Sequence, residues 1–298
     1  MVEETGLLKV QDSIRFTMRS ISPPEELGNV GLFWMVLILT LPFILTFYAV
    51  GEIWPDWLES DPQPLPEMAF SLVSFLLILA FLAVVLKSNL ISWRQVLGSH
   101  LEKPELLHCS LLGIPMVGLA IVCIYVLYLP LSHIWPGFVA SWLLEPEPPI
   151  IWLRSDLDGV LGSAGNLVAA CLLAPIAEEV LFRSLMLNRL RRLWGTTAAI
   201  VLSSLVFAAL HVDHLGAFLF GVILSVYFLR SGSLVGPIVV HASNNVVASV
   251  LEAVSNWWYH PAQTFTIAEF QATWWFGIIG TMICVPWLVV FWRAYIAR

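Results

Sequence analysis

Apolar runs alternate with polar or charged segments along the whole chain. We expect eight membrane spans, at residues 30–50, 68–86, 111–129, 159–187, 196–210, 215–229, 234–251 and 274–292. A helix of about 20 apolar residues is long enough to cross a hydrocarbon core of roughly 30 Å. The pattern therefore predicts an all-α fold, a polytopic integral membrane bundle of about eight transmembrane helices, with both chain termini on one side.

The composition supports a lipid environment. Hydrophobic residues make up 59% of the chain and charged residues 12%, whereas about a quarter of the residues of a soluble domain are charged. The net charge of -7 argues against a nucleic-acid partner. The four cysteines have no metal-binding spacing and lie in or beside apolar runs, so we interpret them as packing residues.

The basic residues are distributed asymmetrically, which predicts the orientation of the chain. All but one of the 14 lysines and arginines fall at or near one face of the expected bundle, and the exception is Arg154. The opposite loops are acidic and rich in tryptophan. Because cytoplasmic loops carry an excess of Lys and Arg, this face and both termini are expected to be cytoplasmic. The residues at this face are Lys9, Arg15, Arg19, Lys87, Arg94, Lys103, Arg183, Arg189, Arg191, Arg192, Arg230, Arg293 and Arg298.

Four regions follow from this pattern. Residues 1–29 form a polar cytoplasmic segment, which does not resemble a cleavable signal peptide. Residues 30–158 hold three transmembrane helices with their loops. Residues 159–251 form a four-helix membrane core that carries the chemically interesting residues. Residues 252–298 hold an outer loop and the last transmembrane helix.

Two adjacent carboxylates and an arginine lie in the fourth predicted span, in the sequence Glu178-Glu179-Val-Leu-Phe-Arg183. Ionisable side chains inside a membrane are costly unless they are paired or hydrated. Glu179 and Arg183 are four residues apart, so they share a helical face and can form an ion pair. Glu178 points about 100° away and is left to act as a general base. The alternative interpretation is a buried salt-bridge cluster that only fixes helix packing.

Two further spans bring polar groups to the membrane interior or its edge. The fifth span ends at His211, and the seventh contains His241 and Asn245, which share one face because they are four residues apart. Carboxylates, imidazoles and an amide from three spans argue against packing alone. Asn244 points about 100° away from Asn245 and is left out of the candidate site.

Asp213 and His214 lie in the turn expected between the fifth and sixth spans. Polar residues are ordinary in turns, so we expect them to have a structural or solvated role.

Glu-Glu-x-x-x-Arg, Phe-x-x-x-His and His-x-x-x-Asn follow one another on separate apolar segments. This order resembles the type II CAAX prenyl endopeptidases and their bacterial relatives, the bacteriocin-processing (immunity) and lysostaphin-resistance-like proteins, over roughly residues 161–251. The resemblance implies an intramembrane endopeptidase that matures CAAX-box proteins. It implies that Glu178 is the catalytic base, that His211 holds the water, and that His241 and Asn245 stabilise the oxyanion. Glu179 and Arg183 would support them. The implied partners are the lipid bilayer and a membrane-associated peptide or protein substrate, whose C-terminus is prenylated in one branch of the family.

One geometric difficulty and several alternatives stay open at this stage. On straight helices His211 would lie on the order of 10 Å further out than Glu178 and His241, so tilt, a deeper start to the fifth span or a break near Pro175 is needed.

No cofactor is favoured, because HExxH is absent. A zinc site would require Glu178, His211 and His241 to converge. A proton-coupled transporter would use the same residues as a relay, although no internal repeat is visible. A non-catalytic membrane scaffold or immunity protein would keep the fold without turnover.

Overall fold

The computed structural model describes residues 25–59, 61–145, 148–259 and 265–295, and every regular element in these ranges is helical. A single isolated β-bridge in them pairs Gly98 with Ser233. Two elements, η2 and η3, are π-helical, and η1 is a 3-10 helix. The predicted all-α fold is confirmed. The elements are η1 Glu25–Asn29, α2 Leu32–Ile53, α3 Pro64–Ser88, α4 Trp93–Leu97, α5 Lys103–Leu111, α6 Gly113–Ile134, α7 Pro136–Leu143, α8 Leu157–Val168, η2 Ala169–Leu173, α9 Ala174–Glu179, η3 Val180–Met186, α10 Leu187–Ala208, α11 His214–Ser231, α12 Val235–Tyr259, α13 Ile267–Ala272 and α14 Trp275–Tyr295.

Six helical stretches in the described residues are long and apolar enough to cross a membrane, so the chain is an integral membrane protein. One of them, Leu157–Ala208, has 52 residues and contains two of the predicted spans. A straight helix of that length would measure about 78 Å, far more than the bilayer core. Gly195 interrupts it with φ 80° and ψ 172°, a conformation that essentially only glycine adopts. The apolar helix Trp275–Phe291 is shorter than the other candidates. The count of eight therefore stays a prediction.

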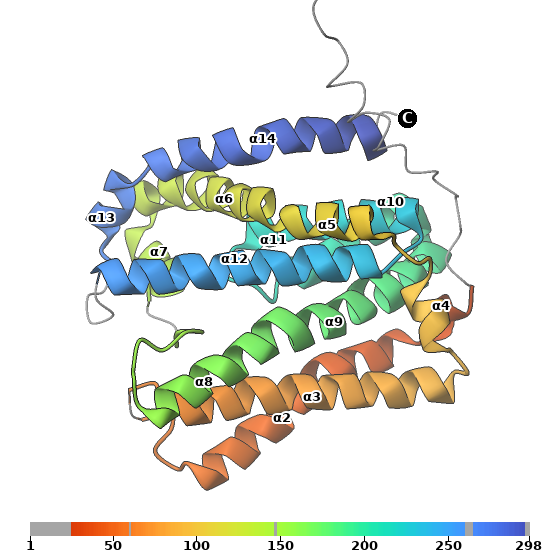
Figure 1. Ribbon diagram of the computed structural model, residues 1–298, viewed down its shortest axis with the longest axis horizontal. Coiled ribbons are helices and arrows are strands. Elements are labelled where there is room, and N and C mark those ends of the chain that lie inside the picture. The colour runs from red at the N-terminus through yellow and green to blue at the C-terminus, as the bar shows by residue number, and fades with distance from the viewer. Residues whose placement is uncertain (1–24, 60, 146–147, 260–264, 296–298) are drawn as a thin grey trace, which may run out of the picture.

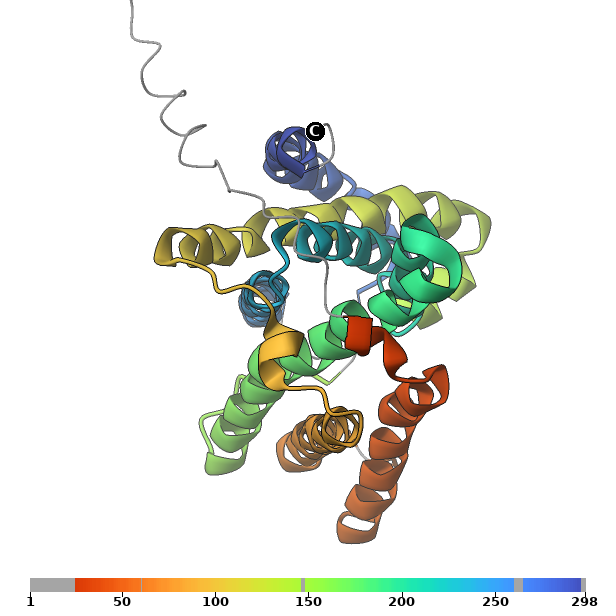
Figure 2. The ribbon, with the colours of Figure 1, turned by 90° about the vertical axis from the view of Figure 1, so that its right-hand side faces the viewer.

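The long helices form a bundle in which the stretch from α8 to η3 joins two groups (Figure 1). In the first group α2 packs on α3, and α3 packs on α8. In the second, α6 lies against α14, α11 and α12, and α11 also packs on α10. The end-on view shows α9 between α3 and the helices of the second group (Figure 2). Because α9 carries the two glutamates, the candidate carboxylates lie where the two groups meet.

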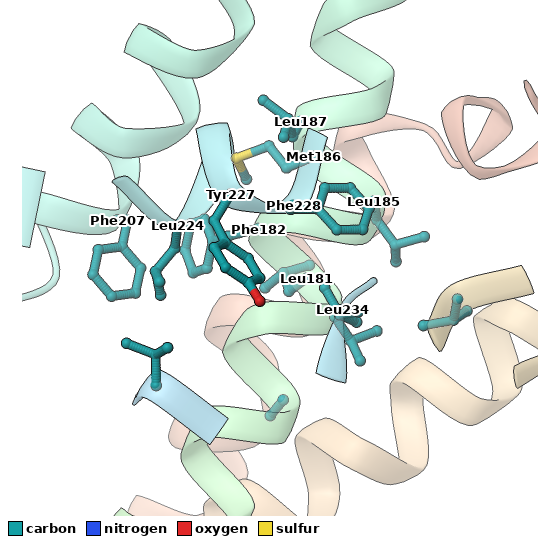
Figure 3. Packing of buried hydrophobic residues seen from close by; sticks show 14 of the residues in the cluster. Leu181, Phe182, Leu185, Met186, Leu187, Phe207, Leu224, Tyr227, Phe228 and Leu234 are labelled. Atoms are coloured by element: carbon teal, nitrogen blue, oxygen red, sulfur yellow. The ribbon is translucent and has the colours of Figure 1, made fainter. Parts of the chain in front are cut away.

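A core of buried apolar side chains holds η3 against α10 and α11. Figure 3 shows Leu181, Phe182 and Leu185 of η3 among Phe207 of α10 and side chains of α11. The contributing residues of α11 are Leu224, Tyr227 and Phe228. On the outer surface, by contrast, large apolar side chains of α2, α3 and α14 are exposed, which is expected of helices whose solvent is lipid. The buried apolar core therefore lies inside the bundle, and the lipid-facing apolar side chains lie on its outside.

Basic side chains gather at one end of the bundle, as the sequence predicts. Lys87, Arg230 and Arg293 lie in the last turns of α3, α11 and α14, and those helix ends point to the same end of the bundle as α4 (Figure 1). Arg154 precedes α8 at the opposite end. Arg183, which the sequence counts with this face, is 1% exposed and is paired with Glu179 inside the bundle. Lys9, Arg15, Arg19 and Arg298 lie outside the described residues.

Candidate active site

The helix that carries the two glutamates changes its winding on both sides of them. The π-helical turns η2 and η3 flank the short helix α9, which contains Pro175, Glu178 and Glu179. Proline has no N–H to donate and its ring clashes with the carbonyl four residues earlier, so Pro175 disfavours the regular α-helical register. A widened π turn accommodates this, and such turns are frequent at functional sites. The sequence left a break near Pro175 open as one of three possibilities; the structure shows a change to the π register there, within a continuous helical stretch.

Glu179 and Arg183 form the predicted ion pair. The Nε atom of Arg183 lies 3.1 Å from Oε2 of Glu179, and the two side chains are 1% and 0% exposed. The guanidinium also stacks on the ring of Phe207, with Cζ 4.4 Å from the ring centroid. A planar guanidinium can satisfy a carboxylate and an aromatic face at the same time. Arg183 is therefore fixed between α9 and α10.

His241 of α12 lies between the two glutamates. Its Nδ1 is 2.8 Å from Oε1 of Glu179, and its Nε2 is 3.8 Å from Oε2 of Glu178. A carboxylate can only accept, so Nδ1 carries the proton of the shorter contact. The buried Glu179 thereby fixes the orientation of the ring and turns Nε2 toward Glu178.

Glu178 differs from its neighbour in burial. Its side chain is 21% exposed, whereas that of Glu179 is completely buried. Arg183 is paired with Glu179, and Oε2 of Glu178 has no hydrogen-bond partner among the described residues. The contact of 3.8 Å to His241 is longer than a direct hydrogen bond, and such separations are commonly bridged by water. Glu178 is thus the more exposed side chain of this pair, although its Oε2 atom is itself buried.

His211 lies in the turn just after α10, which ends at Ala208. Its Nδ1 is 2.8 Å from the carbonyl oxygen of Phe207 and its ring lies against the Phe207 ring, with a centroid distance of 4.3 Å. The same phenylalanine ring lies 6.0 Å from the ring of His241. Because a carbonyl only accepts, Nδ1 of His211 is the donor and Nε2 keeps its lone pair. Phe207 thus contacts both imidazoles and Arg183, although the sequence shows it only as the first residue of the Phe-x-x-x-His motif.

Asn245 ties α12 to the π turn before Pro175. The N–H of Ala174 bonds to the carbonyl of Ala169, in the π register. The next donor in that register would come from position 175, which is proline, so the carbonyl of Ala170 lacks a helical partner. The Nδ2 of Asn245 donates to that carbonyl at 2.8 Å. A side chain from another helix thus supplies the hydrogen bond that the proline removes.

Asn244 also contacts this cluster, although the sequence analysis left it out. Its Nδ2 donates to Oδ1 of Asn245 at 3.2 Å. The rotation of about 100° between consecutive residues describes their Cβ directions, but two adjacent amides are long enough to meet. Asn244 is therefore a neighbour of Asn245, and its exclusion from the candidate site stays a prediction.

The ion pairs and hydrogen bonds connect the two glutamates with Arg183 and His241. His211 reaches this cluster through the Phe207 ring, whereas Asn245 bonds to the backbone of η2. Residues 161–247 match the Type II CAAX prenyl endopeptidase Rce1-like family. The resemblance predicted from the motifs is confirmed over this segment, which contains Glu178, Glu179, Arg183, His211, His241 and Asn245.

A curated relative is an uncharacterized 24.3 kDa protein of Escherichia coli. It is 39% identical over 84 residues, which are 26% of this chain and 39% of the relative. The chain thus spans about two fifths of the length of that relative. No solved structure matches the chain.

Within the part of the chain that the structure describes, no three His, Cys, Asp or Glu side chains are grouped so that they could hold a metal ion. Glu178, His211 and His241, the set considered for zinc, do not form such a group. His211 lies on the Phe207 ring, whereas His241 lies between the glutamates. The expectation that the Rce1-like segment works without a cofactor stays a prediction.

Asp213 and His214 have the structural roles expected of them. Oδ1 of Asp213 accepts from the N–H of Gly216 at 3.0 Å and caps α11, and Nδ1 of His214 is 3.0 Å from the carbonyl oxygen of Val212. Burial raises the pKa of the Asp213 carboxyl to about 6, and the hydrogen bond from Gly216 opposes that shift only in part. The turn that carries His211 is closed by these two residues.

Proposed function

We propose that this chain is an intramembrane endopeptidase that hydrolyses a peptide bond of a membrane-associated substrate with water activated by Glu178. One observation carries the proposal. A partly exposed carboxylate faces Nε2 of a buried histidine at 3.8 Å, and the Glu179–Arg183 pair holds that histidine in place. The match of residues 161–247 to a family of membrane endopeptidases supports the same reaction class.

Nε2 of His241 faces the substrate side of the cluster next to Glu178. A proton on this nitrogen makes it a donor, as an oxyanion requires.

Glu178 takes a proton from the water molecule as the water oxygen forms a bond to the carbonyl carbon of the substrate. The second O–H of the water donates a hydrogen bond to Nε2 of His211. This bond orients the lone pair of the water oxygen that attacks the carbonyl carbon. Nε2–H of His241 and the second N–H of the Asn245 amide stabilise the oxyanion. Glu178 then passes its proton to the amide nitrogen of the substrate, the C–N bond breaks, and a carboxylic acid and an amine leave.

The substrate class follows from the position of the site. The cluster lies inside a bundle whose outer surface contacts lipid, so a substrate with a lipid or transmembrane anchor reaches it at a high local concentration. A peptide with a prenylated C-terminal CAAX sequence is the specific substrate that the family name suggests. Leader peptides that are anchored in a membrane form the broader class.

The test uses purified full-length protein in detergent and in liposomes. Quenched-fluorescent C-terminal peptides are supplied with and without a prenyl group, before and after exhaustive chelation, and with zinc added back. We expect the wild type to cleave the anchored peptide faster and to keep its activity after chelation. A His211→Ala variant should retain the fold and lose cleavage. A folded wild type that cleaves neither anchored CAAX peptides nor leader peptides would instead support a non-catalytic scaffold.

A further inference from the structure

The carbonyl oxygen of Val212, the residue after His211, receives several hydrogen bonds. Tyr128 donates from its hydroxyl at 2.8 Å and Trp142 donates from Nε1 at 3.2 Å. Nδ1 of His214 lies 3.0 Å away, and the N–H of His214 bonds to the same oxygen at 3.1 Å. A carbonyl oxygen has two lone pairs, so this is an unusually crowded acceptor.

Two of these donors come from outside the turn. Tyr128 belongs to α6 and is 2% exposed, and Trp142 belongs to the short helix α7. The contacts from His214 already close the turn locally. The hydrogen bonds from Tyr128 and Trp142 have a different effect, because they fix the position of the turn relative to α6 and α7.

The direction of the Trp142 N–H is itself constrained. The Trp142 ring stacks on Phe138 with a centroid distance of 6.2 Å and meets the His214 ring edge to face at 5.2 Å. Aromatic neighbours on two sides restrict how the indole can rotate. The donor is thus held in place toward the carbonyl of Val212.

His211 needs such support because it lies beyond the C-terminal end of α10. α10 ends at Ala208, and Nδ1 of His211 is held on its N-terminal side by the carbonyl of Phe207. On its C-terminal side the backbone is held through Val212 and the Asp213 cap. A displacement of about 1 Å in a catalytic group can lower a rate by about a hundredfold.

We propose that Tyr128 and Trp142 are positioning residues, which hold His211 in its catalytic place through the Val212 carbonyl. The inference rests on the proposed function, in which His211 orients the water. It assigns to α6 and α7, which lie outside the matched segment, a direct effect on the reaction. Tyr128 and Trp142 themselves contact neither water nor substrate in this account.

The test compares Tyr128→Phe, Trp142→Phe and the double variant with the wild type in purified full-length protein. Each substitution removes one donor and keeps an aromatic ring. Tyr125→Phe is the matched control, because Tyr125 lies on the same helix and its hydroxyl is 2.8 Å from Oγ1 of Thr273, in the loop before α14. We expect the double variant to lower kcat by about tenfold to a hundredfold with KM within about twofold, and the control to change neither.

A second measurement does not depend on turnover. The rate at which diethyl pyrocarbonate modifies His211 is followed by mass spectrometry, with the other histidines as internal references. The double variant should change the rate at His211 severalfold, and the control should not.

Equal kcat and equal His211 modification in the double variant and in Tyr125→Phe would overturn the proposal. If the wild type shows no peptidase activity the proposed function fails, while the modification rates still decide whether these residues position His211. If the double variant does not fold, the single variants carry the same comparison.

Discussion

Glu178 and Glu179 are adjacent and chemically identical, yet their surroundings differ. The rotation of about 100° between them turns Glu179 toward Arg183 and His241, where it is fully buried, and leaves Glu178 partly exposed. The sequence predicted this division, because the contact between Glu179 and Arg183 lies within one helix and depends only on helical periodicity. The contact of His241 with Glu179 crosses between helices and could not be predicted without their packing.

Arg183→Ala should destabilise the protein more than Glu178→Gln does. Removing one partner of a buried pair leaves the other charge uncompensated, at a cost of roughly 3–5 kcal/mol. Glu178→Gln keeps the shape of a side chain that is not part of that pair. Thermal melts of both variants in the same detergent measure the difference. Equal melting temperatures, with normal yield of Arg183→Ala, would show that the pair does not stabilise the fold.

Asp213→Asn should stabilise the protein at neutral pH. The pKa of Asp213 is raised to about 6, so the folded state binds its proton more tightly than the unfolded state. The contribution of Asp213 to stability is therefore present at low pH and is lost as pH rises from about 4 to about 6, by up to roughly 3 kcal/mol. Asparagine cannot ionise and remains a good N-cap.

The melting-temperature advantage of Asp213→Asn over the wild type should grow between pH 4 and pH 7. Asp156→Asn is the control, since Asp156 caps α8 in the same way. The hydrogen bond from Arg154 lowers the pKa of Asp156, so its titration falls below this range and its effect should be constant across it. An advantage of Asp213→Asn that does not depend on pH would contradict the raised pKa.

At the scale of elements, the sequence was least informative about the helical winding of the fourth predicted span. Pro175 made a break one of three possibilities, but did not indicate that two π turns would surround α9. Periodicity analysis assumes a single angle per residue, so it cannot locate a change from the α to the π register. Nor could it show that an amide of α12 would bond to the carbonyl that the proline leaves open.

Asn245→Ala and Pro175→Ala should be energetically coupled. Asn245→Ala alone leaves the carbonyl of Ala170 unpaired and should cost about 1–3 kcal/mol. In the Pro175→Ala background an N–H is present at position 175, so the same substitution should cost measurably less. A double-mutant cycle of unfolding free energies measures the coupling.

Asn244→Ala is the matched control for this cycle. Asn244 donates to the side chain of Asn245 rather than to the backbone of η2, so its substitution should cost the same with proline or alanine at position 175. Strict additivity of Asn245→Ala and Pro175→Ala would show that the amide does not replace the lost helical donor.

At the scale of the whole molecule, hydropathy was sufficient to place the long apolar helices, but not the short helices α4, α7 and α13. Each expected span coincides with a helix or with part of the Leu157–Ala208 stretch. This success has a simple cause, because lipid requires every backbone polar group to be paired within the segment. The way the spans pack was not predictable, since all of them are apolar on most faces.

Both chain termini should be cytoplasmic, with eight crossings. The argument is the concentration of basic side chains at the end of the bundle near α4, against Arg154 at the other end. Reporter fusions at the two termini, between α2 and α3 and between α12 and α13 would report the side of each segment. A C-terminal reporter on the outer side would contradict the count of eight.

The most direct test of the account is the cleavage rate of Glu178→Gln against that of the wild type, on an anchored peptide that the wild type cleaves. Glutamine keeps the size of the side chain and removes only the basic oxygen. A general base contributes about a hundredfold to ten-thousandfold, so we expect kcat to fall by that factor while the melting temperature is unchanged. A folded Glu178→Gln protein that cleaves at the wild-type rate would contradict the assignment of Glu178 as the group that activates water.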